Sequence, residues 1–92
     1  MTAYLTQEAI ASRIEEIIQE HIGTDEVLTS ETHLQDDLAV DSLERVELGI
    51  KLEKAFGISL TNDKIRNVIT LGDFIQLVVQ QVELQKGEEN RV

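Results

Sequence analysis

The spacing of apolar residues near the start of the chain constrains the fold most, because it follows the period of an α-helix. Residues 7–22 contain a stripe of isoleucines at positions i, i+4, i+7 and i+8: Ile10, Ile14, Ile17 and Ile18. This spacing predicts an amphipathic helix with one buried face. Thr6 can cap its start, and Gly23 can turn left-handed at its end, so the expected bounds are 7–22.

A second helix is predicted over residues 42–56, between Asp41 and the stop signal Gly57. Asp41 can cap this helix because its carboxylate reaches the free N–H groups of the first turn, and Glu44 stands three residues later, as in a capping box. Ser42 then occupies the first helical position, with its hydroxyl exposed. A helix N-terminus favours phosphate by about 0.3–1 kcal/mol at an exposed site, so a serine here is well placed to carry a phosphate ester.

The second helix carries two apolar stripes on nearly opposite sides. The first stripe is Leu48, Leu52 and Phe56, and the second is Leu43, Val46 and Ile50. One stripe is enough to enter a core, so the second is either covered by a neighbouring short helix or left partly open for a partner. Gly49, in the middle of the helix, costs about 1 kcal/mol relative to alanine and allows either close backbone packing or a space beside the core.

A long loop and a short helix are expected on either side of the second helix. Residues 24–40 have no sustained period, but their spaced apolar residues predict a loop packed over the other helices. Thr61 can cap a short helix over residues 62–68, with Ile65 and either Val68 or Ile69 facing inward.

A last helix begins after Thr70, which is a suitable N-cap with Asp73 three residues on. Its expected apolar face is Phe74, Ile75, Leu77, Val78, Val82 and Leu84. Residues 85–92 are polar and are expected to form a flexible tail. The predicted fold class is all-α: one domain over residues 1–92 with a core of about 6–84, built as a small bundle of three longer helices and one short helix.

Composition excludes several classes of function. The 92 residues include no cysteine, so disulfides and protein thiol chemistry are absent. The net charge of −10 argues against binding to nucleic acid or to an anionic membrane, and it suits basic partners. The sequence shows no signal peptide and no apolar run long enough to span a bilayer, so we expect a cytoplasmic protein, and a monomer.

The sequence contains no recognisable catalytic set. Ser42 has no adjacent base, and the two histidines, His21 and His33, stand in a helix end and in the loop. Asp36 and Asp37 lack the surrounding pattern of a calcium loop, and no metal site is predicted. Without an activating base, Ser42 is better interpreted as a substrate hydroxyl that another protein modifies than as a nucleophile.

Three short motifs resemble those of a known family. They are Asp37-Leu38, Asp41-Ser42-Leu43 and Glu47-Leu48. Together with the order of helices over about residues 6–84, they resemble the acyl carrier proteins. The resemblance implies that Ser42 receives 4′-phosphopantetheine from coenzyme A through a separate phosphopantetheinyl transferase. It also implies a non-enzymatic role, in which the arm carries acyl groups as thioesters between enzymes of fatty-acid, polyketide or specialised lipid synthesis.

The resemblance also assigns roles to residues around Ser42. Asp41 would assist recognition by the transferase and its Mg²⁺ site, and Leu43 would flank the attachment site. The residues that match partner-facing positions are Leu43, Glu44, Val46, Glu47 and Ile50. The stripe that contains Leu48 and Leu52 would line a core that can shelter the acyl chain.

Two departures from the family pattern leave alternatives open. Ala39 stands where the family usually has glycine, and a positive φ there would strain alanine by roughly 1 kcal/mol or more. Residues 42–56 have no net charge, whereas the carriers of primary fatty-acid synthesis are acidic in this helix, which suggests a dedicated partner set. The alternatives are a helical adaptor with an unmodified Ser42 and, less favoured for lack of a base, a small hydrolase that uses Ser42.

Overall fold

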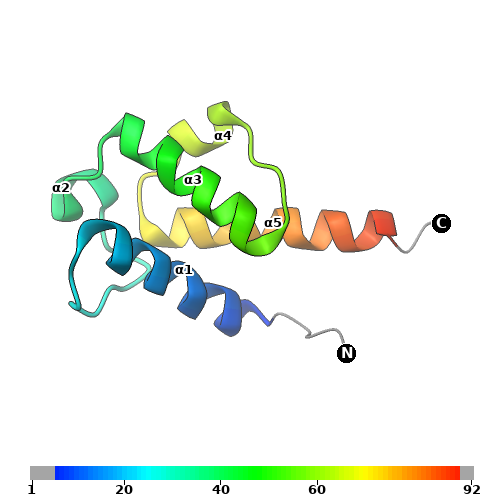
Figure 1. The fold of residues 1–92 in the computed structure, drawn as a ribbon, viewed down its shortest axis with the longest axis horizontal. Coiled ribbons are helices and arrows are strands. Elements are labelled where there is room, and N and C mark those ends of the chain that lie inside the picture. Colours follow the sequence, from blue (N-terminus) through cyan, green and yellow to red (C-terminus); the bar gives the residue numbers. More distant parts are fainter. Residues whose placement is uncertain (1–5, 90–92) are drawn as a thin grey trace.

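The computed structural model describes residues 6–89, with side chains described as far as Gln85, and this part of the chain is helical apart from its loops (Figure 1). The helices are α1 (Gln7–Ile22), α2 (Leu34–Leu38), α3 (Ser42–Phe56), α4 (Asn62–Arg66) and α5 (Leu71–Glu89). The predicted all-α class is therefore confirmed. None of the described helices is long and apolar enough to cross a membrane.

The three longer helices enclose the core, and α4 packs beside α3. Helix α1 contacts both α5 and α3, while α5 runs along the long dimension of the molecule (Figure 1). All four isoleucines of the α1 stripe are buried, as the helical period predicts. The largest fully buried side chain among the described residues is Phe74 of α5, and the other buried members of its core cluster are aliphatic.

The predicted helix caps are present in the structure. The Thr6 hydroxyl accepts a hydrogen bond from the Ala9 amide at 3.1 Å, and the Thr61 hydroxyl accepts one from the Lys64 amide at 3.3 Å. At the start of α5 the capping is reciprocal: the Asp73 amide donates to the Thr70 hydroxyl, and the Thr70 amide donates to the Asp73 carboxylate, both at 3.1 Å. Each cap satisfies backbone donors that a helix start leaves free.

The loop after α1 is fastened to the bundle, as its apolar residues predict. Its Leu28 is buried, and the Leu28 amide donates to the Glu15 carboxylate at 2.8 Å. Further along, the Leu71 amide donates to the Thr32 carbonyl at 2.9 Å, and the Leu34 amide donates to the Ile69 carbonyl at 3.0 Å. These backbone bonds join the loop and the start of α2 to the segment that leads into α5.

Two elements differ from the sequence prediction. The loop contains the five-residue helix α2, which is too short to reveal a helical period. Helix α5 continues to Glu89, past the expected end before Gln85, because residues such as Gln and Glu favour helix without needing an apolar stripe. The Gln85 amide group donates to the Gly57 carbonyl at 2.7 Å, which ties this extension to the end of α3.

Smaller corrections concern inward and outward residues. Helix α4 ends at Arg66, and of the two candidates after it Val68 is buried while Ile69 is 53% exposed. On α5, Leu84 is exposed, whereas Leu71 and Val79 are buried in addition to the predicted face.

Gly49 lies at the contact between α3 and α4. A Cβ atom at Gly49 would meet the Ile65 side chain, with Cγ1 only 3.1 Å away and Cδ1 closer still. Ile65 is buried, so its side chain has little room to move. The glycine therefore serves close packing, which resolves the two possibilities left by the sequence.

Gly49→Ala is expected to lower the free energy of unfolding. The gain in helix propensity is about 1 kcal/mol, but overpacking against buried Ile65 costs about 1–3 kcal/mol. Urea unfolding of the variant and of Gly49→Ala/Ile65→Val provides the measurement, because the valine removes Cδ1. The double variant should recover stability relative to Gly49→Ala; a single variant more stable than the wild type would contradict this packing.

Candidate functional site

The segment between α2 and α3 is a tight turn that determines where α3 begins. Ala39 has a left-handed backbone, with φ 57° and ψ 32°, and its amide donates to the Gln35 carbonyl at 3.0 Å. The next amide, of Val40, donates to the Leu34 carbonyl at 2.9 Å. The Ala39 bond ends α2 in the αL motif, in which the first residue after the helix is left-handed and its amide bonds back to the last turn. Val40 is fully buried directly after this turn.

Ala39 therefore has the positive φ that would strain an alanine at this position. A left-handed conformation brings Cβ close to the following carbonyl oxygen and costs about 1–2 kcal/mol for a residue other than glycine. In the described part of the chain, Ala39 alone among non-glycine residues has a positive φ. The buried Val40 and the two backbone bonds hold the turn in this conformation.

Asp41 caps α3, as predicted. Its backbone is extended and its carboxylate accepts a hydrogen bond from the Glu44 amide at 2.9 Å. The reciprocal half of a capping box is replaced by another contact: the Glu44 carboxylate lies 3.7 Å from Nε2 of His21, on α1. Ser42 is the first residue of α3 and is exposed.

The surroundings of Ser42 offer no activating base within the described residues. Both ring nitrogens of His21 already have polar neighbours: Nε2 lies near the Glu44 carboxylate, and Nδ1 is 3.0 Å from Lys51 Nζ. His33 Nδ1 lies 3.3 Å from the Asp36 carboxylate. The described chain likewise holds no group of three side chains suited to a metal ion. The arrangement presents an exposed hydroxyl at a helix start without a base beside it.

The second apolar stripe of α3 is largely open. Leu43 is 68% exposed and Ile50 is 46% exposed, while Val46 is half-buried against the core. Glu47, between them on the helix surface, is exposed and Glu44 is half-buried. The opposite stripe enters the core, where Leu48 and Leu52 are fully buried. Of the two interpretations of this stripe, the structure supports an open surface.

Arg45 is a residue that the sequence analysis did not single out. It lies three residues after Ser42, and its Nη1 donates to the Val40 carbonyl at 3.3 Å. Its Nε is buried without a hydrogen-bond partner among the described atoms. An unmet buried donor costs about 1–3 kcal/mol, so this guanidinium has an unused capacity to bind an acceptor close to Ser42. The sequence contained one indication of this neighbour, because Arg45 stands one helical turn after Ser42.

A hollow of about 320 Å³ lies where α2, α3 and the end of α4 meet. Its lining residues are His33, Gln35, Asp36, Arg45, Arg66, Val68 and Ile69. An exposed serine at a helix N-terminus, beside an arginine with an unmet donor, fits a phosphate ester better than it fits a hydrolytic site.

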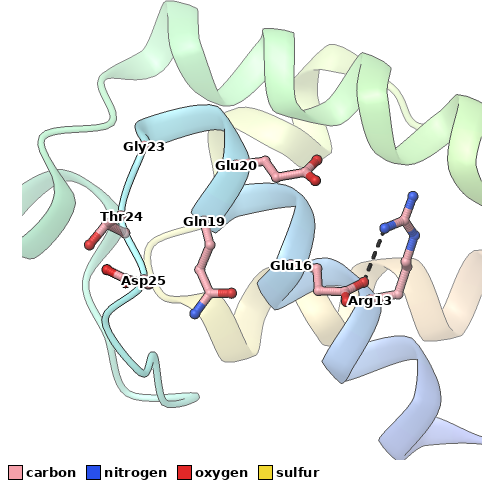
Figure 2. A pocket seen from close by; sticks show the side chains of 7 residues that line it. All are labelled: Arg13, Glu16, Gln19, Glu20, Gly23, Thr24 and Asp25. Carbon is pink, nitrogen blue, oxygen red and sulfur yellow. Dashed lines mark hydrogen bonds and ion pairs between the residues drawn. The ribbon is translucent and has the colours of Figure 1, made fainter.

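A second hollow lies beside the end of α1 and the turn that follows, and Figure 2 shows its side chains. Arg13 there pairs with Glu16 at 3.1 Å. The Gln19 amide group donates to the Glu26 carbonyl at 2.7 Å, which fastens the start of the loop to α1. These contacts give this hollow a structural role.

Comparison with known proteins identifies relatives over most of the chain. The family model described as phosphopantetheine attachment site matches residues 12–78. A candidate acyl carrier protein from Mycobacterium tuberculosis has a similar solved structure, with a TM-score of 0.75 and 33% identity over 78% of this chain and 97% of that one.

Two further solved structures share the fold. An acyl carrier protein from Thermotoga maritima has a TM-score of 0.77 and 20% identity, over 91% of this chain and 99% of that chain. A holo acyl carrier protein from Geobacter metallireducens has a TM-score of 0.73 and 24% identity, over 85% and 91% of the two chains.

Ala39→Gly is expected to stabilise the protein by roughly 0.5–1 kcal/mol, because it relieves the left-handed alanine while adding some entropy to the unfolded chain. Ala55→Gly, at an exposed position inside α3, is the matched control and should destabilise by about 0.5–1 kcal/mol. Urea unfolding of both variants gives the comparison. Equal destabilisation by the two glycines would mean that Ala39 carries no strain.

Proposed function

This chain belongs to the acyl carrier protein family, whose model describes the phosphopantetheine attachment site, and on that premise we propose that Ser42 is the residue that carries the cofactor. Members of this family are carriers, not enzymes. The observation that supports Ser42 most directly is its exposed position as the first residue of α3, directly after the Asp41 cap.

The chain's own residues would present the attachment point and keep it accessible. Phosphopantetheine, when bound, supplies a flexible arm whose thiol holds acyl groups as thioesters. The Asp41 cap and the turn at Ala39 fix the start of α3, so that the Ser42 hydroxyl faces solvent. Leu48 and Leu52 are fully buried on the other side of the helix, and we propose that they flank the acyl chain when the core shelters it.

We propose the exposed stripe of α3 as the surface that docks the phosphopantetheinyl transferase and the acyl-handling enzymes. Its residues are Leu43, Glu44, Val46, Glu47 and Ile50. Leu43 and Ile50 offer apolar contact, and the glutamates suit basic groups on a partner. Asp41, exposed next to Ser42, would assist the transferase.

The charge of this surface favours a dedicated pathway. Arg45, Lys51 and Lys54 offset the glutamates of α3, so the helix lacks the uniformly acidic face of a general fatty-acid carrier. We propose polyketide or specialised lipid synthesis as the setting, with the protein acting as a cytoplasmic monomer. The holo form of the Geobacter metallireducens protein supports the capacity of this fold to hold the cofactor.

The alternative is a helical adaptor that binds its partners with Ser42 unmodified. One observation favours it: the left-handed turn before the attachment site is made by Ala39 in place of the more permissive glycine. A modification assay with coenzyme A and a transferase distinguishes the carrier from the adaptor.

Incubation of the protein with coenzyme A, Mg²⁺ and a transferase of broad specificity is expected to add one phosphopantetheine, measured by intact mass. Ser42→Ala should remain unmodified, because it lacks the hydroxyl. Ser59→Ala is the matched control, since Ser59 is also exposed but lies in the connector after α3, and it should be modified like the wild type. Failure of several transferases to modify the wild type would favour the adaptor.

A further inference from the structure

The hollow beside α3, lined by Arg45 and Arg66, holds an excess of positive charge in a strongly acidic protein. We call it the cationic hollow. Within the described residues no carboxylate lies within ion-pair distance of either arginine. The one acid in its lining, Asp36, lies 3.3 Å from His33 Nδ1 and thus has its own neighbour. Two guanidinium groups are therefore available to an anion.

Of the two arginines, Arg45 lies close to the start of α3. Residues three apart on a helix are surface neighbours, so Arg45 and Ser42 lie next to one another. The bond from Arg45 Nη1 to the Val40 carbonyl keeps the guanidinium close to the turn that precedes Ser42. Because Nη1 is occupied, the edge formed by Nε and Nη2 is the one left for an acceptor, and Nε has none.

We propose that Arg45, assisted by Arg66, binds the phosphodiester of the phosphopantetheine arm at Ser42, an inference that rests on the proposed function. A guanidinium edge matches two phosphate oxygens, and such charge-assisted bonds are the stronger ones. The free N–H groups of the first turn of α3 would add to the same anion. Together they would direct the arm from Ser42 toward the cationic hollow, whose wall includes the apolar residues Val68 and Ile69.

Burial of Nε favours a tethered phosphate over an acidic group of a partner protein. An incoming carboxylate would have to reach a donor that is screened from solvent. A phosphate attached to Ser42 remains within one helical turn of Arg45, and this tethering gives it a far higher effective concentration than a carboxylate that arrives from solution. The competing interpretation is that Arg45 binds a carboxylate of a partner protein. Measurements on the holo protein without any partner distinguish the two ligands.

The test compares the Arg Nε–H signals of the ¹⁵N-labelled apo and holo proteins by NMR, after intact mass has confirmed the arm. The Arg45 Nε–H signal should shift on attachment, and its exchange with water should slow by about tenfold, as expected for a new charge-assisted hydrogen bond. The Arg13 signal serves as the internal control, because its guanidinium already pairs with Glu16. An Arg45 signal that is the same in both forms overturns the inference and favours the acidic partner.

Thermal unfolding gives a second readout on the same proteins. The compared quantity is the Tm of the holo form minus the Tm of the apo form at low salt. This difference should be higher in the wild type than in Arg45→Gln by roughly 4 °C, and added salt should bring the two values closer together. Lys54→Gln is the matched control, because it removes one positive charge from the far end of α3 and should behave like the wild type. Equal changes in Arg45→Gln and Lys54→Gln count against the inference. Absence of any modification overturns the proposed function itself, and this inference with it.

Discussion

The burial of Val40 directly after a left-handed residue is the constraint on which the rest of the site depends. Val40 is fully buried, and its amide is bonded back to Leu34, so the chain enters the core at one defined point. It must then leave the core at once, because Asp41 caps a helix whose first residue is exposed. The accessibility of Ser42 thus follows from the packing of a neighbour two residues before it.

Helix α3 joins the core to the surface because its two sides differ. Leu48 and Leu52 of α3 are buried in the core. Gly49, also on α3, lets the Ile65 side chain of α4 pack directly against the α3 backbone. Leu43 and Ile50 remain exposed, although burying a side chain of this kind stabilises a fold by about 1.5–3 kcal/mol. An apolar surface next to an exposed serine is consistent with transient contact with partners, which a fully closed bundle could not provide.

Local signals made most of the fold predictable from the sequence. The Thr6, Asp41 and Thr70 caps have side chains with a direct mechanism, and the α1 stripe has a clear period, so these elements have the expected starts. Helix α2 and the conformation of Ala39 depend on contacts distant in sequence, since the loop and the start of α2 are bonded to residues 69–72 and Val40 is buried in the core. The extension of α5 likewise depends on a contact distant in sequence, between Gln85 and Gly57.

The site was predictable to the same extent. The position of Ser42 follows from the cap. The sequence shows only that Arg45 comes one helical turn after Ser42, whereas its contact with the Val40 carbonyl and its place in the wall of the cationic hollow depend on the fold. The intact mass of the protein purified from its source cells tests the central claim most directly. The account predicts a mass increased by one phosphopantetheine, located on the peptide that contains Ser42. A native protein without the arm, or with the increase on another serine, would contradict it.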